Sequence, residues 1–158
     1  MATKISASAL KVTIIESITL KGQQQGTTNI ISIPSIATIS KRIIDVTTTE
    51  AVIATFSAAI GAGNYIAADV MYMRFTNLDD TNFVTLTFRN QDNDEVAIKL
   101  DAGLSFVWNG DNANGMTAVF NATQDADAAS STNFGSLTNI QADADTGAVD
   151  LEMFIACK

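Results

Sequence analysis

The chain has 158 residues, of which 47% are hydrophobic and 16% charged, and its 17 acidic and 9 basic residues give a net charge of −8. Enough apolar side chains are present to bury the core of one folded domain, which excludes an intrinsically disordered protein. Nucleic acid is not expected as a partner, because an acidic chain without a cluster of Lys or Arg lacks the positive surface that contacts phosphates.

The first 35 residues predict an N-terminal arm or edge strand region. Apolar and polar residues alternate over residues 11–21, which predicts one long, half-buried strand with Ile15 as an exception on its polar face. Residues 22–26 begin and end with glycine and predict a turn or flexible loop. Pro34 limits the next apolar stretch to an edge or irregular segment, because proline cannot donate a hydrogen bond to a sheet.

Neither a targeting segment nor a membrane span is predicted. Residues 1–4 are followed by no apolar run, so we expect no secretory signal and synthesis in a cytoplasm. The uncharged span 51–68 is interrupted by polar residues and by Gly61 and Gly63. A membrane helix needs about 20 mostly apolar residues. We therefore predict a strand at residues 51–57, followed by a glycine turn, and no membrane as a partner.

The remaining chain, residues 36–158, predicts a β-sandwich domain that forms a single folded unit with the arm. After strands at residues 38–47 and 51–57, four strands over residues 70–108 predict an antiparallel meander. This meander begins with a hairpin of residues 70–76 and 84–89, and its predicted core-facing residues include Met71, Met73 and Phe75.

The C-terminal third continues the same pattern. Residues 116–120 predict a strand, and residues 121–133 predict an exposed loop or a short helix. A last hairpin is predicted from residues 137–142 and 148–156, with these side chains facing the core: Val149, Leu151, Met153 and Ile155. Many short strands between turn signals predict an all-β fold, an antiparallel β-sandwich that is jelly-roll-like and carries the extended N-terminal arm.

Histidine is absent, and Cys157 is the only cysteine. Every catalytic or zinc site that relies on histidine is therefore excluded, as is an intramolecular disulfide. We expect no enzyme, no catalytic residue and no cofactor. A hydrolase that uses paired carboxylates has only the acidic residues themselves in its favour. Cys157 is expected in a terminal strand or in a frayed tail.

Two acidic loops are the candidates for a metal site. Asp92, Asp94 and Glu95 on one loop, and Asp143 and Asp145 on another, offer the oxygen ligands that calcium prefers. Their spacing is not that of an EF-hand. We interpret both as solubilising hairpin loops and expect no metal, with calcium binding as the alternative.

Three aromatic residues, Tyr65, Tyr72 and Trp108, are the candidates for stacking on a glycan. Trp108 lies on the same face of its predicted strand as Phe106, which predicts burial in the core. Tyr72 alternates with Met73 and is predicted to face outward, where tyrosine is enriched in subunit interfaces.

Residues 70–89 contain the runs VMYMRF and VTLTF, and residues 134–157 contain LTNI, ADADT and VDLEMFI. Both segments resemble small virion structural proteins of tailed bacteriophages that infect marine bacteria. The resemblance implies a component of the phage particle, either a capsid decoration protein or a tail or fibre-associated piece. Its motifs are structural and carry no catalytic or binding residue.

The expected function is that of a capsid decoration or cement protein in the virion. Its expected partners are itself, as a homo-oligomer such as a trimer, and a major capsid or other virion protein. The predicted interface residues are Ile15, Ile30, Ile31, Ile33, Tyr65 and Tyr72. The alternative is a tail or fibre knob that binds host-surface glycans through Tyr65, Tyr72 or the loops rich in Asn and Asp.

Overall fold

Strands dominate the structure, a computed structural model that describes residues 5–59, 61–109 and 137–158. The predicted strand at residues 116–120 and the predicted loop at residues 121–133 lie outside these residues. The described elements are β1 (Ser8–Ile15), β2 (Thr19–Leu20), β3 (Gln23–Gln24), β4 (Thr28–Ile36), β5 (Thr38–Val46), β6 (Ala51–Ser57), β7 (Asn64–Ile66), a 3-10 turn η1 (Ala67–Asp69), β8 (Val70–Asn77), β9 (Val84–Asn90), β10 (Glu95–Leu100), β11 (Ser105–Asn109), β12 (Leu137–Ala144) and β13 (Val149–Cys157).

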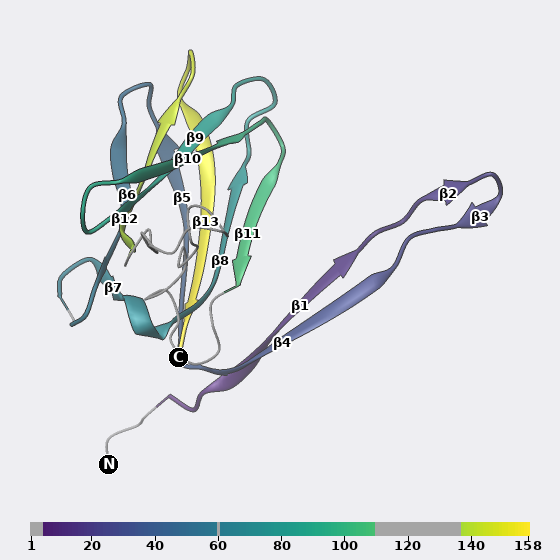
Figure 1. The fold of residues 1–158 in the computed structure, drawn as a ribbon, viewed down its shortest axis with the longest axis horizontal. Helices are drawn as coiled ribbons and strands as arrows, with labels where there is room; N and C mark the ends of the chain where they lie inside the picture. The colour runs from purple at the N-terminus through teal and green to yellow at the C-terminus, as the bar shows by residue number, and fades with distance from the viewer. Residues whose placement is uncertain (1–4, 60, 110–136) are drawn as a thin grey trace, which may run out of the picture.

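Two sheets pack face to face as a sandwich (Figure 1). One sheet has the order β11-β8-β13-β5, and the other has the order β10-β9-β12-β6, with β7 added in parallel to β6. These two sheets contain eight described antiparallel strands. In chain order, the last (β13) lies between the first (β5) and the third (β8), and the seventh (β12) lies between the second (β6) and the fourth (β9). This is the strand order of a jelly roll, so the predicted all-β sandwich is confirmed.

The core lies between the two sheets and is filled from alternate positions of each strand. On β13 the inward side chains are Val149, Leu151, Met153 and Ile155, as predicted, and all are fully buried. Phe75 on the neighbouring strand β8 lies beside them in the same sheet, and Phe88 on β9 belongs to the opposite sheet; both are buried in the same core. Period-two alternation places one face of a strand against the partner sheet, so the sequence pattern identified this face correctly.

The predicted meander and the predicted last hairpin are wrong. Strands β8 and β9 lie in different sheets, and so do β12 and β13; only β9 and β10 form a hairpin within residues 70–108. Residues 78–83 are long enough to cross the gap of about 10 Å between packed sheets. Alternation reveals which side of a strand is buried but not which sheet the strand joins.

Asn77 ties the loop of residues 78–83 to the end of β10 at one end of the sandwich. Its buried Nδ2 donates to the carbonyl oxygens of Asn82 at 2.9 Å and Leu100 at 3.1 Å, and its Oδ1 accepts from the backbone N–H of Asp79 at 2.9 Å. Replacing Asn77 with alanine leaves these groups without partners, so we expect the free energy of unfolding to fall by about 2 kcal/mol or more. Urea denaturation measures this; a change below about 0.5 kcal/mol would contradict it.

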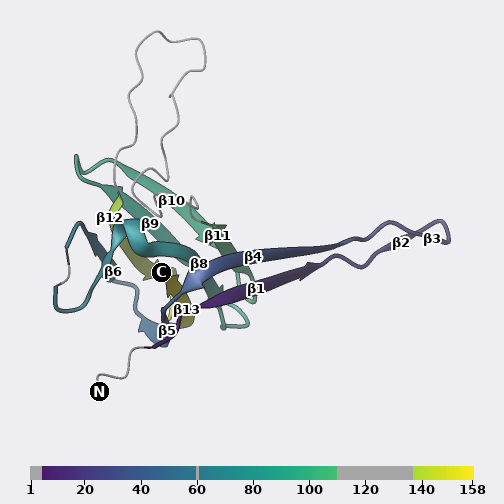
Figure 2. The same ribbon diagram turned by 90° about the horizontal axis from the view of Figure 1, so that it is seen from below.

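The N-terminal residues form a hairpin that projects from the sandwich, as predicted for an arm (Figure 2). We call residues 8–36 the arm. Strand β1 pairs with β4, and the short strands β2 and β3 continue the ribbon to its end. The reversal occurs at Lys21 and Gly22, which have φ of 50° and 78°, the two positive values of a type I′ hairpin turn. The predicted strand over residues 11–21 is therefore interrupted after Ile15, and the turn overlaps the predicted 22–26 loop at Gly22 alone.

A bulge marks the place where the arm meets the sandwich. The β1–β4 register shifts between the pairs Ser8–Ile36 and Leu10–Ile33, and Ser35 has a φ of 63°. Pro34 lies within this shift, where it removes no regular ladder bond. The predicted irregularity at Pro34 is confirmed.

Candidate interaction surface

The root of the arm covers part of the outer face of the sheet that contains β5. Ile33 and Ile36 of the arm are buried against Met71, Tyr72 and Ala156, and form a second apolar cluster outside the sandwich. The partly buried side chains around this cluster are Leu10, Val12, Ile31 and Phe154. The root is therefore held by apolar packing on the sandwich.

Met71 lies in this second cluster and not in the core, so its predicted inward orientation is wrong. Ala156 pairs with Tyr72 and Cys157 pairs with Val70, which leaves Met71 as the extra residue of a bulge. A bulge changes the alternation of side chains between the two faces of a strand. As a result, Met71 and Tyr72 both contact the arm root.

Beyond its root, the arm exposes apolar side chains. Ile15 and Ile30 are 70% and 58% exposed, and the pairs Thr13–Ile30 and Ile15–Thr28 place both on the same face of the ribbon. Further along, Ile18 and Leu20 are exposed as well. A two-stranded ribbon is marginally stable in water by itself, so this part of the arm gains stability when another surface covers it.

Gly26 is required where the outgoing and returning segments of the arm approach each other closely. A Cβ atom at this position would lie 1.9 Å from the carbonyl oxygen of Glu16 and 2.9 Å from the Cα of Ser17. Next to this crossing, the backbone N–H of Glu16 donates to the carbonyl oxygen of Thr27 at 2.8 Å. Only glycine fits such a close approach between backbones.

The six predicted interface residues fall into three environments. Ile15 and Ile30 are exposed on the free part of the arm, while Ile31 and Ile33 belong to its root. Tyr72 faces away from the core as predicted, but the arm root leaves it only 4% exposed. This burial raises the pKa of the Tyr72 phenol above its ordinary value of 10.0. Tyr72 therefore contacts this chain's own arm and presents no free surface.

The other two aromatic candidates also pack within the chain. Tyr65 is partly buried, its ring lies 5.9 Å from that of Phe56, and its hydroxyl donates to Ser40 Oγ at 2.9 Å. Trp108 is partly buried against the core, as predicted. Tyr65 and Tyr72 thus have partners of their own at the positions where glycan stacking was considered.

A second exposed surface runs along the outer face of β5, and the sequence analysis did not identify it. We call Ile39, Lys41, Ile43 and Asp45 the β5 row, because alternate residues of a strand share a face. Ile39 and Ile43 are 56% and 62% exposed. Strand β5 lies at the edge of its sheet, next to β13. The row is therefore an apolar surface on an edge strand.

Two acidic residues of β13, Asp150 and Glu152, lie beside this row. Lys41 binds Glu152 at 2.9 Å, and Arg74 forms an ion pair with the same carboxylate; the hydrogen bond from Lys41 and then that from Arg74 hold the pKa of Glu152 below its ordinary value. Asp45 pairs directly with Asp150 across the two strands. Like charges at opposed positions repel, and neither aspartate forms an ion pair with the described residues.

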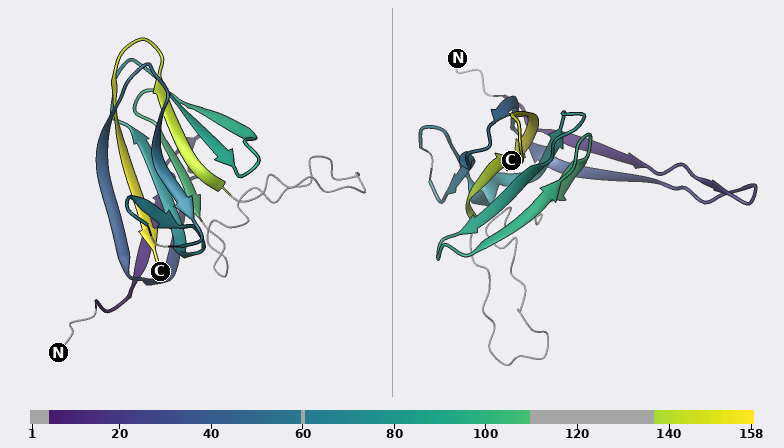
Figure 3. Two further views of the ribbon diagram at one scale, coloured as in Figure 1. Left: turned by 90° about the vertical axis from the view of Figure 1, so that its left-hand side faces the viewer. Right: turned by 90° about the horizontal axis from the view of Figure 1, so that it is seen from above.

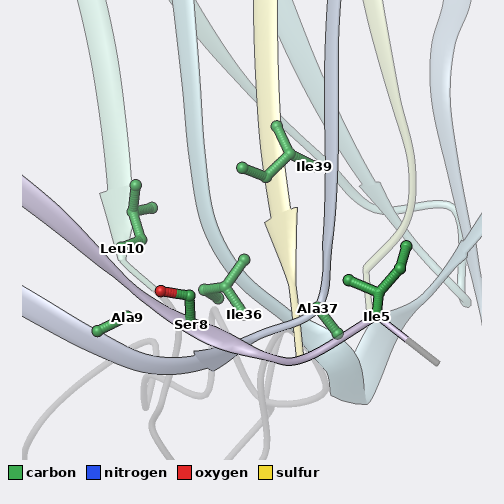
Figure 4. A pocket seen from close by; sticks show the side chains of 7 residues that line it. All are labelled: Ile5, Ser8, Ala9, Leu10, Ile36, Ala37 and Ile39. Atoms are coloured by element: carbon green, nitrogen blue, oxygen red, sulfur yellow. The ribbon is translucent and has the colours of Figure 1, made fainter. Parts of the chain in front are cut away.

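An apolar hollow of about 410 Å³ lies at the lower end of the β5 row, where the arm joins the sandwich (Figure 4). Its lining residues are Ile5, Ser8, Ala9, Leu10, Ile36, Ala37 and Ile39. Ile39 belongs both to this hollow and to the row. Ile39 therefore connects the arm root to the β5 row.

The acidic residues considered for calcium do not gather into one site. Asp94 Oδ2 accepts from Asn90 Nδ2 at 3.1 Å, and Glu95 pairs with Arg89. Asp145 Oδ1 accepts from the backbone N–H of Thr146 at 2.6 Å, at the other end of the sandwich. Within the described residues, no group of three or more Asp, Glu or Cys side chains is arranged to hold a metal ion.

Cys157 is the last residue of β13 and is buried, which confirms the terminal strand and not a frayed tail. Burial, and then the charge of Asp69, raise the pKa of its thiol from 9.0 to about 11. At pH 8 the thiolate fraction falls about 100-fold. We expect a thiol reagent to label the folded protein at least about 100-fold more slowly than the urea-unfolded chain. Equal labelling rates would contradict this burial.

Comparisons with known proteins assign no family to the chain. No family model matches it, and no curated protein is similar to it. One similar solved structure is described as "Bacillus endospore appendages form a novel family of disulfide-linked pili"; the two chains are 10% identical, with a TM-score of 0.43, over 99% of this chain and 91% of that chain. No role is transferred from it at this level of similarity. The described part of the chain contains no helix with the length and apolarity of a membrane span.

Proposed function

We propose that this protein is a non-enzymatic structural subunit of a phage particle. In this proposal it is a capsid decoration protein that assembles with itself and attaches to a major capsid or other virion protein through its arm. The observation that carries the proposal is the ribbon of the arm, which leaves the sandwich and exposes Ile15, Ile30 and Leu20, with no other described segment covering them. The resemblance of residues 70–89 and 134–157 to small virion proteins supports the phage setting.

The arm fits a protein that adds contacts to a shell. A short apolar ribbon buries a modest area on each neighbour, and a symmetric shell repeats such a contact many times. Viral capsid proteins are among the proteins built on jelly rolls; lectins are too, so the fold is compatible with the proposal and does not select it. The absence of histidine from the sequence removes the commonest catalytic base.

Quantitative mass spectrometry of purified particles tests this proposal by counting copies of the chain against the major capsid protein. A decoration protein is expected at roughly tens to hundreds of copies, in a ratio that matches the capsid lattice. A handful of copies would reject decoration in favour of a tail or fibre piece. Absence from the particle would reject a virion role altogether.

A further inference from the structure

The end of the arm lies too far from its own sandwich to be covered by it. The Val12–Ile31 pair is the last that contacts the second apolar cluster. Residues 14–21 then extend for eight positions, or about 26 Å of strand at roughly 3.3 Å per residue. Figure 3 shows the arm leaving the sandwich on one side, with its end well separated from both sheets. Within residues 5–59, 61–109 and 137–158, no surface outside the arm covers this end.

We call residues 16–27 the arm tip. It presents Ile18 and Leu20, both about half exposed, next to Lys21 at the turn. The charges of the two parts of the chain differ in sign. Residues 1–36 contain three lysines and one glutamate, a net charge of +2, whereas residues 37–158 contain six basic and sixteen acidic residues, a net charge of −10. The arm tip itself carries one acid, Glu16 at its inner end, and one base, Lys21 at the turn, so the charge at its outermost point is positive while the sandwich is acidic.

The β5 row has the complementary properties. Ile39 and Ile43 offer exposed apolar contact, and the opposed carboxylates of Asp45 and Asp150 beside them form no ion pair within the part of the chain that the structure describes. Glu152, the neighbouring acid, is already neutralised by Lys41 and Arg74. An incoming lysine would relieve the repulsion between the two aspartates.

We infer that the arm tip of one copy docks on the β5 row of a second copy. Ile18 and Leu20 cover Ile39 and Ile43, and Lys21 lies beside Asp45 and Asp150. This inference rests on the proposed function, because it names the surfaces through which the chain assembles with itself. The donor and acceptor surfaces differ, so the contact is head-to-tail and produces a ring or an open chain of subunits.

Two single variants and their mixture test this contact in the full-length protein by sedimentation velocity over a range of concentrations. Leu20→Asp disrupts the apolar contact of the arm tip and leaves the β5 row intact, whereas Ile43→Asp disrupts the β5 row and leaves the arm tip intact. Each is expected to raise the dissociation constant by about 30-fold or more. An equimolar mixture retains one tip and one row, so it is expected to form a one-to-one dimer that grows no further.

Leu104→Asp is the matched control, because Leu104 is 55% exposed, as Leu20 is, and lies on neither surface. It is expected to assemble like the unmodified chain. A charge-reversal experiment is the second part of the test. Lys21→Glu is expected to weaken assembly, and the triple variant that adds Asp45→Lys and Asp150→Lys is expected to restore it through the reversed charges.

Three results would overturn the inference: a chain that stays monomeric at the highest concentration, an Ile43→Asp variant that assembles normally, or a mixture that forms no dimer. These results are separate from a failure of the proposed function. A monomeric chain found in lattice-matched copy number would retain the decoration role and give the arm a capsid protein as its partner. Self-assembly through the tip and the row, without any copies in particles, would reject only the virion role.

Discussion

Replacing Gly26 with alanine is expected to weaken the inferred assembly through the arm and to leave the sandwich folded. The new Cβ would lie 1.9 Å from the Glu16 carbonyl oxygen and 2.6 Å from its carbonyl carbon. Both are backbone atoms, so no change of side-chain rotamer relieves the overlap, and the ribbon has to open at this crossing. Opening separates the strand with Ile18 and Leu20 from its partner strand.

The expected result is a rise of about 30-fold or more in the dissociation constant, similar to that of Leu20→Asp. The free energy of unfolding of the sandwich is expected to change by less than about 0.5 kcal/mol, because the tip contacts neither sheet. Sedimentation velocity measures the first quantity, and urea denaturation measures the second.

Gly22→Asn is the matched control for this variant. Gly22 has a φ of 78°, and no atom lies within 4 Å of a Cβ built there. Asparagine tolerates this left-handed conformation, so the turn persists and assembly is expected to be retained. Normal assembly of Gly26→Ala would show that a closed arm tip is not needed for the contact.

The faces of individual strands could be predicted from the sequence where the alternation is regular, because alternation reflects burial directly; the bulge at Met71 is where it failed. The inward side of β13 and the outward direction of Tyr72 both follow from this pattern. The partner of each strand could not be predicted in this way. The assignment of β8 and β9 to different sheets depends on loops that cross the sandwich, and nothing in the alternation of residues 70–89 distinguishes such a crossing from a hairpin.

The candidate surface was predictable only in part, for a related reason. Ile15 was notable because an isoleucine interrupts a polar face, and it is exposed on the arm. The β5 row was not predicted because its properties depend on β13, a neighbouring strand that is distant in sequence. The opposition of Asp45 and Asp150 depends on the register between β5 and β13, which the sequence of either strand alone does not reveal.

Tyr72 and Phe75 lie on opposite faces of β8. Replacing each with alanine is therefore expected to destabilise a different part of the molecule: the attachment of the arm for Tyr72, and the whole sandwich for Phe75. Phe75 is fully buried between the sheets, so Phe75→Ala is expected to lower the free energy of unfolding by about 3 to 5 kcal/mol. Tyr72 packs under the arm root, with its ring edge-on to Phe154 at 5.9 Å. Tyr72→Ala removes contacts that hold the arm and leaves the core between the sheets unchanged.

Amide hydrogen exchange distinguishes the two outcomes, because local openings and global unfolding protect different sets of amides. Tyr72→Ala is expected to lose protection in β1 and β4 while β9 and β12 keep it. Phe75→Ala is expected to lose protection in all strands, by about 100-fold or more. Equal loss in β4 and β12 after Tyr72→Ala would mean that the arm and the sandwich unfold as one unit. Selective loss in the arm would mean that the root cluster holds the arm on the sandwich independently of the core between the sheets.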